Sequence, residues 1–308
     1  MYSVGILSGQ RKWPEVLSEM LKSSGSSVSG WINPQESSVF DTQQLIDFSD
    51  LIWIPEKISG TMDAAIQVIR HSRHLSLGFP VVEFMEEAPG MVKLAHEARV
   101  QVQIGHQDWY QPVIRSSMMH ICHPQSIRFI DHLTGLTPDS VHRPAFNAIV
   151  ADLDLALGLS GSTVRRVRPH VSRMLDGTAI QIDIRVEMHN GTVISLVIRK
   201  FAAAAGRSIE IIQPSGILMI DLLNGTSSIL EYSGGSKGFM GPEKVLWPPE
   251  GENNKFSSQA AEGDEQAARQ CLSFIHALER GRHSLSSLEG AFKALEITRQ
   301  IETTLGDF

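Results

Sequence analysis

Short apolar runs alternate with amphipathic stretches from Tyr2 to Pro112. In the helical stretches the apolar residues recur at three- and four-residue spacing, which places them on one face. The expected strands are Tyr2–Leu7, Val28–Ile32, Leu51–Ile54, Val81–Phe84 and Val100–Ile104, and the expected helices are Pro14–Ser23, Asp41–Phe48, Thr61–His71 and Glu86–Ala98. Such alternation is typical of βαβ units. It predicts an N-terminal Rossmann-like domain, a parallel sheet with helices on both faces.

The hydrophobic period changes in the second half of the chain. From Ile180 to Met188 every second residue is apolar, which indicates a strand with one buried face. Asn190-Gly191 then predicts a hairpin, because this pair tolerates the positive φ of a type I′ turn. Further strands are expected at Thr192–Lys200, Ser208–Gln213, Gly216–Leu222 and Ser228–Tyr232. These strands predict an open, mainly antiparallel sheet of about five or six strands.

Helices flank this sheet. The stretch Phe146–Leu157 precedes it, and two helices close the chain, the last with a capping box at Ser286-x-x-Glu289. Between sheet and closing helices, Ser233–Gly263 is rich in Gly, Ser, Pro and Glu and predicts a long loop. The expected fold is therefore α/β plus α+β, divided into domains 1–121 and 122–308.

Composition and charge limit the possible functions. A net charge of −7 and an isoelectric point near 5.9 argue against a nucleic-acid or anionic-membrane surface. The start MYSVGILSG lacks the basic and apolar regions of a signal peptide, and no apolar run is long enough to span a membrane. Two cysteines, Cys122 and Cys271, fit a reducing compartment. A cytoplasmic protein is expected.

The segment Val81–Pro112 reads VVEFMEEAPGMVKLAHEARVQVQIGHQDWYQP. It resembles the middle of the Gfo/Idh/MocA oxidoreductases, in which one strand ends in Glu-Lys-Pro and the next in Gly-His, followed by Arg-Phe-x-Pro. The positions that match the family are Glu83, Gly105, His106 and Pro112, and Tyr110 stands in for the phenylalanine. The departures are Phe84 at the lysine, Met85 at the proline and Trp109 at the arginine.

The resemblance implies a two-domain dehydrogenase that uses NAD or NADP. The segment before the sheet is most similar to the sugar-nucleotide 3-dehydrogenases of that family, which implies a sugar or sugar-nucleotide ligand. It also implies a homo-oligomer formed through the face of the C-terminal sheet. The final SLEGAFKALEITRQIE resembles the family's last helix, which packs back toward the N-terminal domain.

The nucleotide-binding pattern departs from Gly-x-Gly-x-x-Gly. Aligned on the first strand, Ser8, Gln10 and Trp13 occupy the three glycine positions, with Gly9 between the first two. A displaced turn that uses Gly5, Ser8 and Gly9 remains open as a phosphate site. The second strand ends near Trp31, where the family has an acidic residue for the ribose, and only Asn33 offers a polar group nearby. The candidate cofactor residues are Gly5, Ser8, Gly9, Gln10 and Asn33.

The proton-transfer groups of the family are also replaced. By the resemblance, Phe84 stands at the lysine, Asn147 at the aspartate and Ala151 at the histidine. Neither alanine nor asparagine is a general base. The remaining pocket candidates are Glu83, His106 and Tyr110.

Other polar clusters have bland explanations. His120, Cys122 and His123 have metal-binding chemistry but lack a second half, so no metal is expected. The stripe of Arg165, Arg166, Arg168 and His170 is expected to be a solvated sheet face. Asp152 and Asp154 are expected to cap and orient their helix.

Three functions remain open. In the first, the chain is a degenerate family member, a pseudoenzyme that binds a ligand or serves assembly in sugar-nucleotide or cell-envelope metabolism. Alternatively it is an active NAD(P)-dependent oxidoreductase, in which His106, Glu83 or His120 substitutes for the missing groups. As a third possibility, compatible with the first, it is an interaction protein that uses the sheet face.

Overall fold

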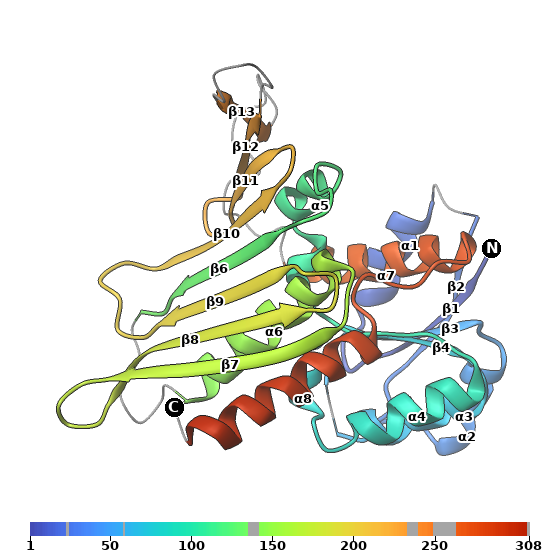
Figure 1. The fold of residues 1–308 in the computed structure, drawn as a ribbon. Helices are drawn as coiled ribbons and strands as arrows, with labels where there is room; N and C mark the ends of the chain where they lie inside the picture. The colour runs from blue at the N-terminus through green and yellow to red at the C-terminus, as the bar shows by residue number, and fades with distance from the viewer. Residues whose placement is uncertain (23–24, 58, 135–141, 233–239, 249–262, 307–308) are drawn as a thin grey trace. The chain divides into compact units, whose positions relative to one another are not determined.

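The computed structural model describes residues 1–22, 25–57, 59–134, 142–232, 240–248 and 263–306. The chain forms two compact units, each made of two segments (Figure 1). The first unit contains Met1–Tyr110 and Ala260–Leu295, and the second contains Gln111–Gln259 and Glu296–Phe308. The division into domains 1–121 and 122–308 stays a prediction.

The first unit is built on a parallel sheet with the strand order β2-β1-β3-β4-β5. Its strands are β1 (Ser3–Leu7), β2 (Ser27–Ile32), β3 (Leu51–Ile54), β4 (His74–Leu77) and β5 (Val102–Gln103). Its helices are α1 (Trp13–Leu21), α2 (Val39–Asp47), α3 (Thr61–Arg70), α4 (Ala88–Ala98) and α7 (Gly263–Glu279). Helices α1 and α7 lie on one side of the strands and α2, α3 and α4 on the other (Figure 1). The predicted Rossmann-like sheet with helices on both faces is confirmed.

One apolar core joins α1 and α7 to the middle of this sheet. Leu17 and Leu21 of α1 pack with Phe274 and Ile275 of α7 over β1 and β3. Trp13 belongs to the same core. Its ring meets that of Trp53 edge to face, with the centroids 5.1 Å apart. This is a favoured aromatic geometry, so a tryptophan at the start of α1 is absorbed by the core.

One predicted strand is wrong. Val81–Glu83 forms a 3-10 turn, and the fourth strand of the sheet is β4, seven residues earlier at His74–Leu77. Pro80 precedes the turn with φ −75° and ψ 157°, and it has no N–H to give to a strand ladder. The chain therefore leaves the sheet before the apolar run Val81–Phe84, which is buried as core.

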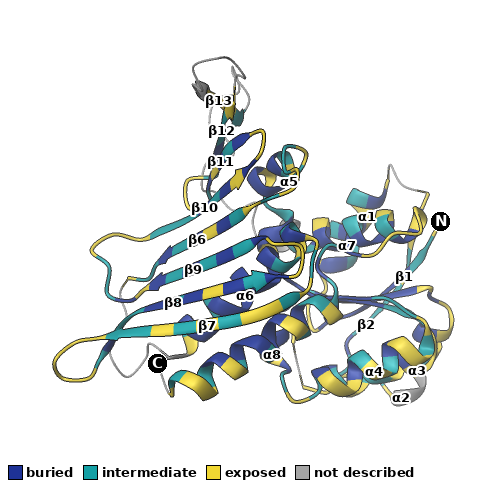
Figure 2. Cartoon of the chain, viewed as in Figure 1, coloured by how far each residue is buried: buried dark blue, intermediate teal, exposed yellow. Residues whose placement is uncertain are grey.

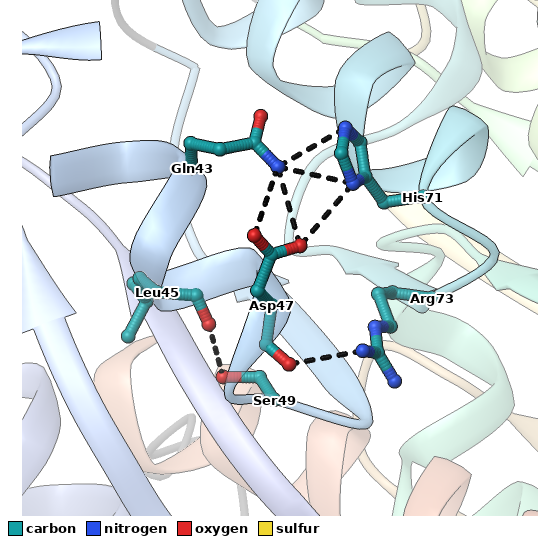
Figure 3. A network of polar contacts seen from close by, with 6 residues as sticks. All are labelled: Gln43, Leu45, Asp47, Ser49, His71 and Arg73. Atoms are coloured by element: carbon teal, nitrogen blue, oxygen red, sulfur yellow. Dashed lines mark hydrogen bonds and ion pairs between the residues drawn. The ribbon is translucent and has the colours of Figure 1, made fainter. Parts of the chain in front are cut away.

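A polar network lies at the amino-terminal edge of this sheet (Figure 3). The Gln43 amide donates to the Asp47 carboxylate over 3.2 Å, and the same carboxylate lies 3.3 Å from His71 Nδ1. Arg73 donates to the Asp47 carbonyl over 2.9 Å. Together these contacts tie the end of α2 to the end of α3, at the amino edge of the strands. These polar residues therefore have a structural role in the first unit.

The second unit is an eight-stranded sheet with the order β13-β12-β11-β10-β6-β9-β8-β7. Its strands are β6 (Ser126–His132), β7 (Val164–Arg173), β8 (Ala179–Met188), β9 (Val193–Arg199), β10 (Gly206–Gln213), β11 (Gly216–Asp221), β12 (Thr226–Tyr232) and β13 (Met240–Trp247). Its helices are α5 (Pro112–Met118) and α6 (His142–Ser160), while α8 (Leu288–Leu305) begins in the first unit and ends in the second. Every neighbouring pair is antiparallel except β6 and β9.

The mainly antiparallel sheet is confirmed, but it has more strands than expected. Strand β6 was not predicted, and β13 lies inside Ser233–Gly263, where a loop was expected. Most of the remainder of that predicted loop, 233–239 and 249–262, lies outside the described residues, and Gly263 begins α7. Buried and more exposed residues alternate along the strands (Figure 2), as the sequence pattern of β8 predicted.

Two local predictions need correction. Asn190-Gly191 does connect β8 to β9 as a hairpin, but only Gly191 has a positive φ, so the turn is not type I′. The N-terminal cap of α8 is Ser287 and not Ser286, because Ser287 Oγ accepts the Gly290 N–H over 3.1 Å. The residue at the third helical position is therefore a glycine, and the capping box expected at Ser286 is not formed.

Candidate functional site

The carboxyl ends of β1 and β3 form the site at which a doubly wound sheet places its ligands. Strand β1 lies between β2 and β3. The chain therefore runs from β1 to β2 on one side of it, and then crosses to β3 on the other side. Ligands bind at this switch point in open α/β sheets. Here β1 is followed by Ser8-Gly9-Gln10, and β3 is followed by Pro55-Glu56.

The carboxylate of Glu56 lies in the turn that follows β1. Its Oε1 accepts hydrogen bonds from Ser8 Oγ over 2.6 Å and from the backbone N–H of Gly9 over 3.1 Å. Its Oε2 accepts from the indole Nε1 of Trp13 over 2.7 Å. Ser8 Oγ in turn accepts from the Gln10 N–H over 2.9 Å. The turn and the first residue of α1 thus hold an anion, and that anion is an internal carboxylate.

Aromatic and basic side chains flank this turn. The guanidinium of Arg11 lies 5.8 Å from the centroid of Trp31, at the end of β2, and the Lys12 ammonium lies 5.0 Å from that of Trp13. Both distances permit cation–π attraction. Asn33 is occupied by its own turn, since its Oδ1 accepts from the Gln35 N–H over 3.0 Å. A ribose would need a hydrogen-bond acceptor here. Trp31 presents an aromatic ring instead, and the amide oxygen of Asn33 already accepts a hydrogen bond from its own turn.

The structure brings only part of the predicted cofactor set together. Ser8, Gly9 and Gln10 form one turn around the Glu56 carboxylate. Gly5 lies inside β1, where a Cβ atom would approach Ser49 Oγ and Ile52 Cδ1 to 2.6 Å, so this glycine serves close packing. Glu56 was not among the candidates, because nothing in the sequence links it to Ser8, 48 residues away.

The position of β4 changes which residue of this chain aligns with the family lysine. The resemblance places Glu-Lys-Pro directly after this strand, and the residues that follow β4 are Gly78, Phe79 and Pro80. Phe84 was assigned to the lysine from a strand that is not formed. Phe79 is 4% exposed and Phe84 is 1% exposed, and their rings meet edge to face with centroids 5.7 Å apart. Whether Phe79 or Phe84 aligns with the family lysine, that position holds a buried phenylalanine of this pair.

Three strand ends are in backbone contact here. A Cβ atom on Gly78 would lie 2.2 Å from the Pro55 carbonyl oxygen, and one on Gly105 would lie 2.3 Å from the Gly78 carbonyl carbon. Only glycine permits such approach. The ends of β3, β4 and β5 are therefore closely packed, which the sequence signalled only through two isolated glycines.

The other pocket candidates divide by burial. His106 Nε2 lies 3.3 Å from Asp108 Oδ2, and both residues are buried at the end of β5. Tyr110 donates from its hydroxyl to Gln103 Oε1 over 3.1 Å, so it holds the buried Gln103. Glu83 is exposed, and its backbone carbonyl accepts from Lys57 Nζ. Of the three candidates, His106 alone presents a titratable group in a buried pair.

In the second unit, Asn147 and Ala151 are one helical turn apart on α6 and both are half-buried. Four-residue spacing puts them on one face. Asp152 and Asp154 lie in the middle of α6, so the expected capping role is wrong. Asp152 is fully buried and accepts from Arg207 over 2.8 Å.

The remaining clusters are as follows. Among the described residues, no group of three or more His, Cys, Asp and Glu side chains could hold a metal ion. The backbone around Cys122 is held by Gln213, which binds the Cys122 N–H over 2.9 Å. In the basic stripe, Arg165 and Arg168 lie 3.5 and 3.7 Å from the carboxylate of Glu187. These pairs fit the expected solvated face.

No family model matches the sequence, and no curated protein does. Solved structures match over almost the whole chain. The UDP-N-acetylglucosamine 3-dehydrogenase from Acidithiobacillus ferrooxidans is 16% identical, with a TM-score of 0.69 over 99% of this chain and 97% of that one. The dehydrogenase MviM from Clostridium difficile is 14% identical, with a TM-score of 0.68 over 99% of each chain. An oxidoreductase from Agrobacterium radiobacter, in complex with NAD+, L-tartaric acid and magnesium, is 13% identical, with a TM-score of 0.65 over 97% and 95%.

The chain has the Gfo/Idh/MocA fold. The Rossmann-like unit and the eight-stranded sheet are the two parts of that fold. At these identities the likeness establishes architecture, and function has to come from the residues of the site. In the described part of the chain, no helix is long and apolar enough to cross a membrane.

Proposed function

We propose that this protein has lost nicotinamide-dependent hydride transfer and keeps the Gfo/Idh/MocA fold for binding a sugar or sugar-nucleotide. One observation carries the proposal, the buried ring pair of Phe79 and Phe84 after β4. A dehydrogenase that oxidises an alcohol needs a group that accepts its proton. A phenyl ring cannot accept a proton, and burial of both rings leaves that segment as apolar core.

The other family positions point the same way. Asn147 and Ala151 on α6 supply neither a carboxylate nor an imidazole. At the end of β2, Trp31 takes the place of the ribose-binding acid, and Asn33 Oδ1 is engaged by the Gln35 N–H. These substitutions lie on different elements, so one misaligned segment does not account for all of them.

The ligand class rests on the similar structures. One of them is named as a UDP-N-acetylglucosamine 3-dehydrogenase and another is in complex with NAD+. We propose a sugar-nucleotide ligand and a role in sugar-nucleotide or cell-envelope metabolism, in the cytoplasm and with no nucleic-acid partner. A nicotinamide cofactor, NAD or NADP, belongs to the alternative function below.

We also propose a homo-oligomer formed through one face of the eight-stranded sheet. Pairing across β10, β11 and β12 aligns Ile212, Ile217 and Leu230 in one row. Ile212 is 38% exposed, and the next row carries Met219 at 37%. An exposed apolar patch of this kind is typical of interaction surfaces.

Thermal unfolding of the full chain with separate ligands tests the proposal. A ligand that binds only the native state raises its stability, by about 2.7 kcal/mol at a concentration one hundred times the dissociation constant. UDP-N-acetylglucosamine should raise the midpoint, whereas NADH and NADPH should not. Oxidation of NADH or NADPH in the presence of any oxidised sugar-nucleotide would contradict the proposal.

A second function is favoured by the buried pair of His106 and Asp108. A carboxylate 3.3 Å from an imidazole nitrogen holds the ring in one orientation, which suits a proton-transfer group. In that case the chain is an active NAD(P)-dependent oxidoreductase in which His106 acts as the base. Turnover by the native chain that is lost in His106→Gln, and kept in the exposed-site control His96→Gln, would establish this function.

A further inference from the structure

Three hydrogen-bond donors converge on the carboxylate of Glu56. They are the Ser8 hydroxyl, the Gly9 N–H and the Trp13 indole N–H, at 2.6, 3.1 and 2.7 Å. Ser8 is fully buried and Trp13 is 4% exposed, so both side chains are fixed in place. We propose that Glu56 is a built-in occupant of the phosphate site of the Rossmann unit. The native turn then takes no phosphate, and it takes one when the Glu56 side chain is removed.

The donor set has the chemistry of an anion site. A backbone N–H after a strand and a hydroxyl are groups that hold phosphate in nucleotide-binding turns, and the Trp13 indole N–H adds a third donor here. Here all three groups donate to one carboxylate, and hydrogen bonds to an ionised acceptor are stronger than those between neutral groups. A phosphate oxygen would accept from the same donors, but it cannot share them with Glu56.

The carboxylate is presented by a fixed segment. Glu56 follows Pro55, whose ring fixes φ and whose carbonyl oxygen would lie 2.2 Å from any Cβ atom on Gly78. The Gly78 N–H also donates to the Ile54 carbonyl over 2.7 Å. Because the backbone that leads into Glu56 is held at Ile54 and Pro55, the side chain is presented to the turn from a fixed strand end. An incoming phosphate would have to displace a pre-positioned anion of the same sign.

Glu56 therefore decides what the Rossmann unit binds. It excludes dinucleotide phosphates by occupying their donors and by repelling their charge. This inference concerns the phosphate turn, whereas the proposed function concerns proton transfer after β4, so each can fail alone. Hydride transfer by the native chain would overturn the proposed function. The inference about Glu56 depends on phosphate binding by the variants.

The test compares the native chain with Glu56→Ala, Glu56→Gln and Glu15→Ala. Inorganic phosphate is the probe, with chloride at equal ionic strength as the reference. Glu56→Ala frees the donors and the space, while Glu56→Gln keeps the space filled with a neutral amide. Glu15 is an exposed acid in the first turn of α1, so its removal changes the charge near the turn without touching the donors.

Phosphate should raise the unfolding midpoint of Glu56→Ala, with an affinity at least about tenfold above that of the native chain, a difference of about 1.4 kcal/mol. The native chain, Glu56→Gln and Glu15→Ala should show no rise beyond that seen in chloride. If Glu56→Ala is unfolded in chloride, phosphate should restore its fold. The proposal would be overturned if the native chain bound phosphate as tightly as Glu56→Ala. It would also be overturned if phosphate neither raised the unfolding midpoint of Glu56→Ala nor restored its fold.

Discussion

The guanidinium of Arg207 on β10 lies between two buried carboxylates, 2.8 Å from Asp152 Oδ1 on α6 and 3.4 Å from Asp131 Oδ1 on β6. Asp152 is fully buried and Asp131 is 3% exposed. Arg207 thereby ties α6 to two strands of the sheet. Within the second unit, this cluster holds the helix that carries Asn147 and Ala151.

Replacement of Arg207 by methionine should destabilise the chain strongly. The change keeps most of the side-chain length and leaves two buried carboxylates without this partner, which costs about 3–5 kcal/mol for a buried pair. Urea unfolding measures the loss. The matched control is Arg128→Met, which removes an exposed pair with Glu210 at 3.6 Å and should cost about 1 kcal/mol or less. Equal losses in the two variants would contradict the prediction.

Gly78→Ala should prevent the ends of β3 and β4 from closing. Its Cβ atom would lie 2.2 Å from the Pro55 carbonyl oxygen, a backbone atom that no side-chain rotation can move, so the strands must separate. We expect a loss above about 4 kcal/mol or no folded protein. Gly90→Ala is the control, since nothing lies within 4 Å of its Cβ on α4. That change should stabilise the helix by about 0.5–1 kcal/mol. Circular dichroism during heating separates the outcomes.

Trp13→Phe should cost more than Trp53→Phe, although the two rings pack against each other. Trp13 Nε1 donates to Glu56 over 2.7 Å, whereas the buried Trp53 Nε1 has no hydrogen-bond partner among the residues that the structure describes. The ring volume lost is the same in both variants. A hydrogen bond to a charged group contributes about 1.5–3 kcal/mol, and this should be the excess cost at Trp13. Chemical denaturation gives the difference, and the reverse order would refute the role of the indole.

Stability should fall as the pH drops below about 6.5, in part because of His74. Burial lowers the pKa of His74 below its ordinary value, and its Nδ1 must stay unprotonated to accept the Gln101 N–H over 3.1 Å. The unfolded chain binds this proton more readily, so the stabilisation present above pH 6.5 is lost as the pH falls. His74→Gln keeps an acceptor and removes the titration. Its unfolding free energy should therefore depend less on pH between about 7 and 5, and an unchanged slope would exclude His74 as the cause.

Periodicity predicted most of the fold because it reports which residues face a core. The alternation from Ile180 to Met188 located β8, and the boundaries of β3 matched its apolar run Leu51–Ile54. It failed at β4, because the run Val81–Phe84 is more apolar than His74–Leu77 although it packs as a turn. Burial alone does not distinguish a strand from a buried turn. Pro80 was the local signal that the strand had already ended.

The site was less predictable because its main contact is between residues far apart in the sequence. Ser8 and Gly9 were identified from their place after the first strand, but their partner Glu56 follows another strand. A lone glutamate after Ile-Pro has no distinguishing pattern. The close approach of Gly78 to Pro55 likewise depends on neighbouring strands in the sheet, which no local pattern encodes.

A nucleotide-binding protein draws part of its stability from its cofactor, so its folded fraction changes with the cellular supply of that nucleotide. In this chain the counter-anion of the turn is a covalent part of the polypeptide, at Glu56. Its effective concentration is therefore constant and independent of metabolism. The Rossmann unit should therefore be equally stable at high and at low concentrations of dinucleotide.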